Sequence, residues 1–142
     1  MLDNWYLADP TNQKGQTEYT GTGYTIDRWL VRHYSGGGFQ SNVTIRLHAM
    51  KCLELINDSD YIGEFQQILE NIPEGTYTLS VLVEDSIAGN SYLRADKSPT
   101  GATINRYISE GSGLYSQIGM LEAGQLYVHI ALAPHAHMGV IY

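Results

Sequence analysis

The stretch "GTYTLSVLVED", residues 75–85, alternates core-type side chains with a second set that mostly carries hydroxyl groups. The first set is Tyr77, Leu79, Val81 and Val83, and the second is Thr76, Thr78, Ser80 and Leu82. A period of two is typical of a β-strand with one face against a core. The turn-forming "PEG" of residues 73–75 comes directly before the alternation. The pattern predicts a strand whose first set faces the core.

A second stretch, "GQLYVHIALAP" (residues 124–134), repeats this arrangement. Leu126, Val128, Ile130 and Leu132 alternate with Tyr127, His129 and Ala131. The repetition, again just after a glycine, predicts a second strand with a similar role in the same system of sheets.

Short extended candidates occupy most of the remaining chain. They are "IDRWLVRH" (26–33), "SNVTIRL" (41–47), "KCLELI" (51–56), "SYLRA" (91–95), "TINRYIS" (103–109), "LYSQIGML" (114–121) and "MGVIY" (138–142). Turn signals such as "SGGG", "IAGN", "KSPTG" and "EGSG" separate them. Short strands with such regular turns are typical of all-β sandwiches. We therefore predict a single all-β domain over residues 1–142, a two-sheet antiparallel β-sandwich.

One segment has a helical period instead. In "DSDYIGEFQQILENI" (residues 58–72) the apolar side chains fall on helical spacing, and Asp58 or Ser59 is available as an N-cap. Gly63 weakens a helix by about 1 kcal/mol relative to alanine, which does not overturn the pattern. Periodicity alone therefore predicts a helix here.

Composition excludes several kinds of partner. The formal net charge of the 142-residue chain is −7 and the pI is about 5.0, so no basic stripe is available for phosphates or anionic headgroups. We expect neither nucleic acid nor a membrane surface as a partner. The single cysteine, Cys52, cannot form an internal disulfide. The opening "MLDNWYLADP" lacks the basic start and apolar run of a signal peptide.

Two groups of residues raise the question of a metal. His135 and His137 alternate in "APHAHM", with His129 upstream, but no acid or cysteine lies within that segment. We interpret them as loop or edge-strand histidines and predict no metal site. Asn57, Asp58 and Asp60 resemble part of a calcium loop, yet the fifth position counted from Asp58 is not an acid or amide, and the terminal glutamate is missing. A solvated turn is favoured over a structural calcium, and no other cofactor is indicated.

Catalysis has little support in the sequence. The carboxylates that are candidates by type are Asp27, Glu54, Glu84, Asp85 and Glu110, and no spacing pairs two of them across a cleft. The chain has no Gly-x-Ser-x-Gly elbow, and Cys52 lies in an apolar alternating run. We expect a protein that is not an enzyme and has no catalytic residues.

Carbohydrate binding fits the residue types better. Aromatic faces stack on sugar rings, while amide and guanidinium groups bind the hydroxyls. Such residues lie beside the predicted turns, and the candidate ligand-binding residues are Tyr34, Tyr92, Arg94, Asn105, Arg106, Tyr107 and Tyr115. For each tyrosine alone, a packing role in an amphipathic strand is the favoured alternative. The hypothesis therefore depends on their collective placement beside loops.

The opening of the chain, "LDNWYLADPTNQKGQTEYTGTGYTIDRW" (residues 2–29), contains an ordered motif. The matching residues are Leu2, Asn4, Asn12, Gln13, Lys14, Gly15, Tyr19, Gly21, Gly23, Tyr24, Asp27, Arg28 and Trp29. They resemble the "L-x-N", "N-Q-[RK]-G" and "Y-x-G-x-G-Y-x-x-D-R-W" phrases of β-sandwich modules in bacteriophage and prophage tail proteins. "FQQILEN" followed by "GTYTLSVLV" resembles the middle strand pair of those modules, so the similarity covers much of the first 85 residues.

The resemblance implies a jelly-roll domain like those of carbohydrate-binding modules, carried on a tail fibre or baseplate. It implies that "FQQILEN" is a strand, and we follow it over the helical period. It gives Trp29 a place in the core, has Gly21 and Gly23 make a turn, and has Asp27 and Arg28 tie neighbouring loops together. Two departures matter: the closing "K-L-E-x-G" phrase of such modules is missing, and residues 87–121 match nothing.

These observations predict a non-catalytic receptor-binding module of the virion that recognises bacterial cell-surface carbohydrate. Other tail proteins are its expected partners, and trimeric display, usual for tail fibres, would raise its avidity. Synthesis in the bacterial cytoplasm without a signal peptide is expected. The rival hypothesis is an assembly module of the tail with no sugar ligand, and it predicts an exposed apolar patch.

Overall fold

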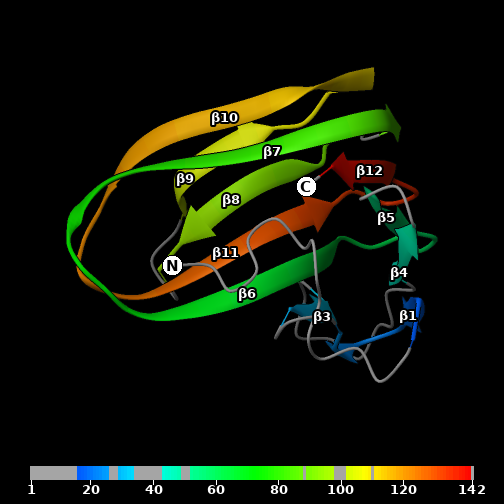
Figure 1. Cartoon of the computed structure of the whole chain (residues 1–142), viewed down its shortest axis with the longest axis horizontal. Coiled ribbons are helices and arrows are strands. Elements are labelled where there is room, and N and C mark those ends of the chain that lie inside the picture. Colours follow the sequence, from blue (N-terminus) through cyan, green and yellow to red (C-terminus); the bar gives the residue numbers. More distant parts are fainter. Residues whose placement is uncertain are drawn as a thin grey trace.

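The computed structural model describes residues 16–25, 29–33, 43–48, 52–87, 89–97, 102–109 and 111–141, and in these residues the chain forms two six-stranded antiparallel sheets (Figure 1). Sheet A has the order β1 (Glu18–Thr20), β4 (Val43–His48), β5 (Cys52–Asn57), β12 (His137–Ile141), β7 (Gly75–Ile87), β10 (Gly111–Leu121). Sheet B has the order β2 (Gly23–Tyr24), β3 (Leu30–His33), β6 (Gly63–Ile72), β11 (Gly124–Leu132), β8 (Tyr92–Asp96), β9 (Ala102–Tyr107). The predicted two-sheet antiparallel β-sandwich is confirmed.

The two stretches with alternating side chains are interior strands of opposite sheets. β7 lies between β12 and β10 in sheet A, and β11 lies between β6 and β8 in sheet B. Val81 and Val83 are buried on β7, and Leu126 and Ile130 are buried on β11. Their apolar sets therefore form part of the core between the sheets, as the alternation predicts. No helix long and apolar enough to span a bilayer occurs in the described part of the chain.

The segment with the helical period is the strand β6, so the helix expected from periodicity alone is wrong and the strand is confirmed. β6 lies between β3 and β11, which supply its backbone hydrogen bonds. From Gly63 to Gln67 every residue is buried, because both faces of this part of the strand are covered. A strand covered on both faces shows no simple alternation of apolar and polar residues. The apolar residues of this segment therefore matched a helical period by spacing alone.

The residues of the opening motif that the structure describes form a corner of the sandwich. Trp29 is buried and its ring stacks on that of Phe65, with 4.5 Å between centroids and 13° between planes. Gly21 and Gly23 have φ angles of 82° and 136°, which side chains rarely adopt. Trp29 in the core and the glycine turn are thus confirmed, while Asp27 lies outside the described residues, as does Arg28.

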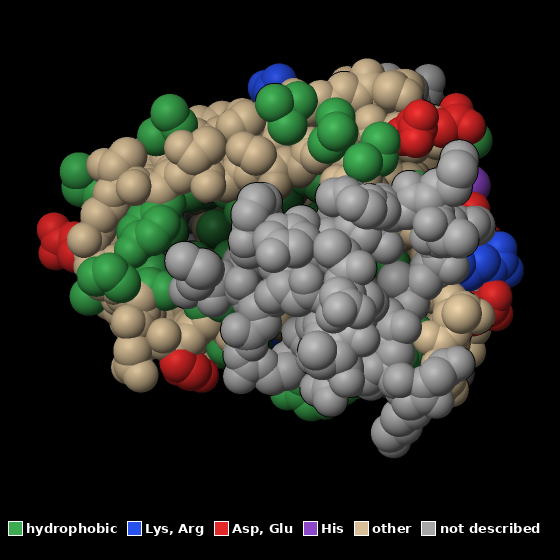
Figure 2. Space-filling model, in the orientation of Figure 1, with side chains coloured by type: hydrophobic (Ala, Val, Ile, Leu, Met, Phe, Trp, Pro, Cys, Tyr) green, Lys and Arg blue, Asp and Glu red, His purple; other side chains and the backbone are tan. Residues whose placement is uncertain are grey.

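The core has two parts. The main cluster packs around Phe65, Leu53 and Leu132, while a smaller cluster around Ile104 and Leu126 lies towards the β6–β7 and β10–β11 hairpins. The two sheets separate towards these hairpins (Figure 1), and a hollow lined by hydrophobic side chains opens between them there (Figure 2). The smaller cluster is therefore less closed than the main one.

Candidate functional site

The candidate site lies on the face of sheet B that points away from the core. On β8, Leu93 and Ala95 are buried in the core, so Tyr92, Arg94 and Asp96 occupy the opposite face. The register of the sheet places Arg94 directly opposite His129 on β11. Arg32 on β3 and the polar residues Glu64 and Gln66 on β6 continue this outer face.

A continuous row of charged groups crosses four strands on this face. Arg32 Nε donates to Glu64 Oε2 at 2.7 Å, and Glu64 Oε1 lies 3.2 Å from His129 Nδ1. His129 Nε2 lies 3.6 Å from Asp96 Oδ2, which in turn lies 2.6 Å from Arg94 Nε. We call these five residues the charged row. It connects β3, β6, β11 and β8 through alternating positive and negative groups.

The charged row favours the ionised forms of its titratable members. Burial alone would lower the pKa of His129, but the contacts with Asp96 and Glu64 outweigh it and raise that pKa above the ordinary value. Burial alone would raise the pKa of Glu64 and of Asp96, yet His129 and the neighbouring arginines lower both. The imidazolium and the two carboxylates therefore stabilise one another, which fixes their orientation.

After Glu64, the next side chain of β6 on this face is Gln66, which pairs with His129 and is also polar. The Gln66 side chain is 1% exposed, and its amide nitrogen and oxygen have no hydrogen-bond partner among the residues that the structure describes. A buried, unpartnered carboxamide destabilises the folded state. Gln66 is thus a polar group on this face that does not stabilise the fold.

Two tyrosines lie at the β8–β9 end of the charged row. The rings of Tyr92 and Tyr107 meet edge to face, with 6.2 Å between centroids and an interplanar angle of 81°. The guanidinium carbon of Arg94 lies 5.9 Å from the Tyr92 ring centroid. Asn105 is exposed directly opposite Arg94, and Tyr107 is 65% exposed. The structure thus brings four of the candidate ligand-binding residues together on one face.

The other candidate residues lie elsewhere. Arg106 pairs with Leu93. It lies two residues after Ile104 and therefore on the same side of β9, opposite to the side of Asn105. Tyr115 is 8% exposed in the main core, and its hydroxyl donates to the Ser109 carbonyl oxygen at 3.1 Å. The interpretation of Tyr115 as an exposed stacking residue is therefore wrong. Tyr34 lies outside the described residues.

Several residues of this face are absent from the sequence-based hypothesis. Asp96 follows Arg94 at the period of the strand, so the alternation in "YLRAD" was the signal that could have indicated it. Glu64 and Gln66 lay within the segment with the helical period, which hid their shared face. His129 was considered only as a metal ligand, because its neighbours on other strands are not visible in the sequence.

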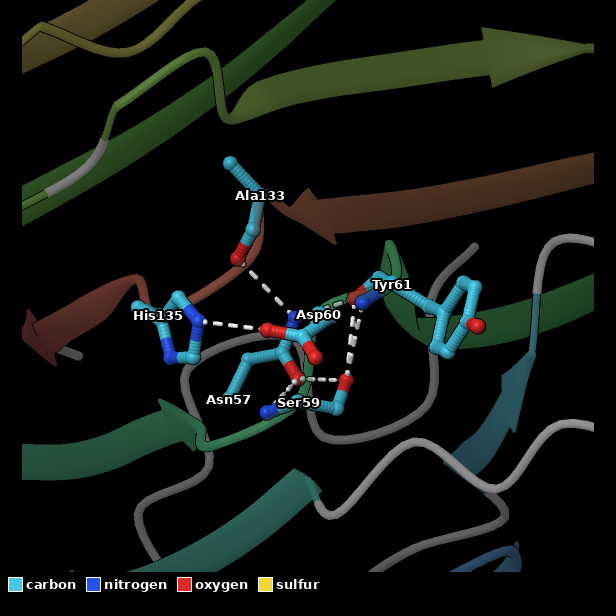
Figure 3. Close-up of polar contacts among 6 residues, drawn as sticks. All are labelled: Asn57, Ser59, Asp60, Tyr61, Ala133 and His135. Carbon is cyan, nitrogen blue, oxygen red and sulfur yellow. Dashed lines mark hydrogen bonds and ion pairs between the residues drawn. The ribbon is translucent and has the colours of Figure 1, made fainter.

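The turn after β5 is held by its own side chains (Figure 3). The Asn57 Nδ2 group donates to the carbonyl oxygens of Tyr61 at 2.8 Å and Ala133 at 2.9 Å. Its Oδ1 atom accepts a hydrogen bond from Ser59 Oγ at 2.7 Å. The segment that resembles part of a calcium loop thus forms a hydrogen-bonded turn that ties β5 to the end of β11. The turn is solvated only in part, because Asp58 and Asp60 are exposed while Asn57 and Ser59 are buried.

The alternating histidines contact different carboxylates. His135 Nε2 lies 3.0 Å from Asp60 Oδ1 (Figure 3), and His137 Nε2 lies 2.7 Å from Glu54 Oε1. Among the described residues, no group of three or more His, Cys, Asp or Glu side chains is arranged to hold a metal ion. The two histidines therefore act in separate surface contacts.

A second group of carboxylates lines an open groove of about 630 Å³ on the outer face of sheet A. Glu54, Glu84 and Asp85 lie there beside Cys52. Glu84 and Asp85 are exposed, and Glu54 is engaged by His137, so none has the apolar surroundings that a glycosidase acid requires. Burial, with Glu84 and Glu54 nearby, raises the pKa of the Cys52 thiol, which disfavours the nucleophilic thiolate.

Comparisons with known proteins bear on the fold. No protein-family model matches the chain, and no curated protein matches it. It resembles a solved structure described as "CBM4 structure and function", a carbohydrate-binding module, with a TM-score of 0.70 at 8% sequence identity. The match covers 99% of this chain and 95% of the other. The chain therefore has the β-sandwich fold of that carbohydrate-binding module.

Proposed function

We propose that this chain is a non-catalytic module that binds carbohydrate on the outer face of sheet B. The observation that carries this proposal is the position of Tyr92 and Tyr107 next to the charged row. The exposed ring of Tyr107 offers an apolar face to a sugar ring. Arg94 and Asn105 lie beside it and supply directed hydrogen bonds to hydroxyl groups. A sugar-binding face needs an aromatic ring and hydrogen-bonding side chains close enough together to contact the same sugar.

The charged row supports this role because it prepares the face before a ligand arrives. Asp96 fixes Arg94 through the 2.6 Å contact, and His129 fixes Asp96 from the other side. Groups that are already oriented lose less conformational entropy when a ligand binds. The likeness to a carbohydrate-binding module adds support for the fold on which such a face is built.

Binding to a glycan array, followed by calorimetry on each hit, tests this proposal. The variant Tyr107→Ala should weaken binding at least tenfold and leave the melting temperature within about 2 °C, because an exposed ring contributes little to the fold. Tyr61→Ala, which removes a 42% exposed tyrosine from the β5–β6 turn, is the matched control and should bind as the wild type does. Equal affinities of both variants for every hit would refute the proposal.

The biological setting that we propose is a phage or prophage tail fibre or baseplate that binds bacterial surface carbohydrate. This part rests on the resemblance of residues 2–29 to tail modules. Trp29 and the two glycines take the structural roles which that resemblance implies. Localisation in the virion and trimeric display belong to the same proposal. Labelled domain should bind host cells, and added cell-wall polysaccharide should compete for it.

A second candidate function, assembly with other tail proteins, is favoured by a different observation. Sheet A carries an exposed apolar patch, the β10 patch, on the outer face of β7 and β10. Its members are Leu82 (41% exposed), Leu114 (68%), Ile118 (62%) and Met120 (69%). β10 is an edge strand, and Gly111–Leu121 contains no charged residue. Exposed apolar patches and unprotected edges are typical of protein contacts.

Sedimentation analysis distinguishes the two functions. If the β10 patch serves assembly, Ile118→Asp should reduce self-association or binding to a tail partner and leave glycan binding intact. If carbohydrate binding is the function of the domain, only the Tyr107→Ala variant should lose the glycan. The two faces lie on opposite sheets, so each variant reports on one of them.

A further inference from the structure

A cavity of about 260 Å³ lies between the two sheets, at the end where β6 turns into β7. It is separate from the outer face of sheet B, because the buried side chains that line it belong to the inner faces of the strands. Its buried floor consists of Ile72, Ala95, Ile104, Leu121, Leu126 and Val128. Figure 2 shows the hydrophobic hollow that opens at this end of the molecule.

The lining changes from apolar to polar towards the opening. Leu69, Tyr77 and Leu79 are half-buried, and they pack against the small core cluster that forms the floor. Glu70 and Thr78 also line the cavity and are exposed. An apolar interior with a few polar groups near its opening is the usual character of a small-molecule site.

This partly open cavity leaves apolar side chains of the smaller core cluster without packing partners on one side. Protein interiors contain few voids larger than a water molecule, and each one weakens the packing around it. A cavity lined by aliphatic side chains does not hold water well, but it does bind apolar molecules. Since a cavity of about 150 Å³ accommodates one benzene ring, about 260 Å³ leaves room for a molecule with two fused rings.

Charge restricts the ligand further. The described residues that line the cavity include no Lys, Arg or His, and they include the carboxylate Glu70. The whole chain has a formal net charge of −7. An anionic ligand would find no countercharge there and would be repelled by the surrounding field.

We propose that this cavity binds a small uncharged apolar molecule, no larger than about two fused rings. The Leu79→Trp variant tests the site, since Leu79 is a half-buried wall residue and the larger ring would fill the cavity. Leu82→Trp is the matched control, because it makes the same substitution on the same strand at a position exposed on the outer face. Leu121→Phe, from the floor, is a second filling variant should Leu79→Trp not fold.

The experiment measures the melting temperature of the wild-type chain and both tryptophan variants against increasing naphthalene. The inference predicts a saturable rise for the wild type and for Leu82→Trp, and none for Leu79→Trp. Sodium 2-naphthoate, of similar shape but anionic, should shift the wild type at least tenfold less at equal concentration.

Three results would overturn the inference. No saturable shift up to the solubility limit of naphthalene would show that the cavity does not accept such a molecule. An equal shift in Leu79→Trp would place binding elsewhere. A wild-type dimer in sedimentation that becomes monomeric in Leu79→Trp would show that a second copy of the chain fills the cavity.

Discussion

Removing the charge of Glu64 gives the sharpest test of the charged row. Its side chain is 0% exposed and contacts both Arg32 and His129. Breaking a buried ion pair on one side costs about 3–5 kcal/mol, because the remaining charge stays buried without its partner. Arg32 is 45% exposed and can turn towards water, so the loss falls mainly on His129. We expect Glu64→Gln to lower the free energy of unfolding by about 3 kcal/mol.

The pH dependence of the variant gives a second and independent readout. The folded state raises the pKa of His129 above its ordinary value of 6.5. The stabilisation from His129 is therefore fully present below pH 6.5 and is lost as the pH rises through the higher pKa of the folded state. Removing Glu64 takes away one of the two carboxylates that raise this pKa. The decline in stability above pH 6.5 should therefore be smaller in Glu64→Gln than in the wild type.

The assay is urea unfolding followed by tryptophan fluorescence between pH 5 and pH 9, with the slope m checked for each variant. Arg46→Gln is a suitable control, since its contact with Glu18 joins two exposed side chains. A loss below about 1 kcal/mol in Glu64→Gln, with an unchanged pH profile, would refute the view that the charged row is an integrated buried network.

Three further substitutions test the fold. Trp29→Ala removes the ring stacked on Phe65 and should cost about 3–5 kcal/mol of unfolding free energy in urea titrations. Asn57→Ala removes a fully buried amide that ties the β5–β6 turn to β11, so thermal unfolding should show a loss of about 2 kcal/mol or more. Gly139→Ala would place a Cβ atom 3.1 Å from the Glu84 backbone oxygen, and calorimetry should show a loss of about 1–3 kcal/mol.

Gly139→Ala and Asn57→Ala each have a matched control. Gly113→Ala adds a Cβ whose nearest neighbour is a ring atom at 3.7 Å, so it should be nearly neutral. Asn105→Ala changes an exposed amide and should stay within about 0.5 kcal/mol of the wild type. If Gly139→Ala or Asn57→Ala behaved like its control, the packing described around that position would be incorrect.

The fold was predictable from the sequence where one face of a strand meets the core. β7 illustrates this, because its buried set from Val81 to Val83 alternates with exposed residues. β6 was not predictable from periodicity, because residues 63–67 are covered on both faces. The segment is a strand because it pairs with β3 on one side and β11 on the other. There the resemblance of "FQQILEN" and "GTYTLSVLV" to a strand pair of a known family gave the correct answer, since an ordered match carries tertiary information that a short periodic pattern lacks.

The candidate site was predictable only in part. Tyr92, Arg94 and Tyr107 do lie together, because their strands pair directly. Adjacent residues of a strand point to opposite faces, so Asn105 could not share a face with Arg106. Tyr115 shows the other difficulty: its position just after a turn is visible in the sequence, but the face of β10 that enters the core is not.

The charged row could not be predicted from the sequence. Its members come from four strands that are neighbours only in the assembled sheet, and one-residue changes in register would separate them. The assembled face, with two tyrosines at one end and fixed charges beside them, is what supports the proposal of carbohydrate binding.

The most direct test of carbohydrate binding is an NMR titration of the labelled domain with the glycan that binds most tightly on the array. We expect saturable amide shifts that map to β8 and β9, centred on Arg94 and Asn105, and the loss of these shifts in Tyr107→Ala. Shifts confined to sheet A, or none from a folded domain with any glycan, would contradict this expectation.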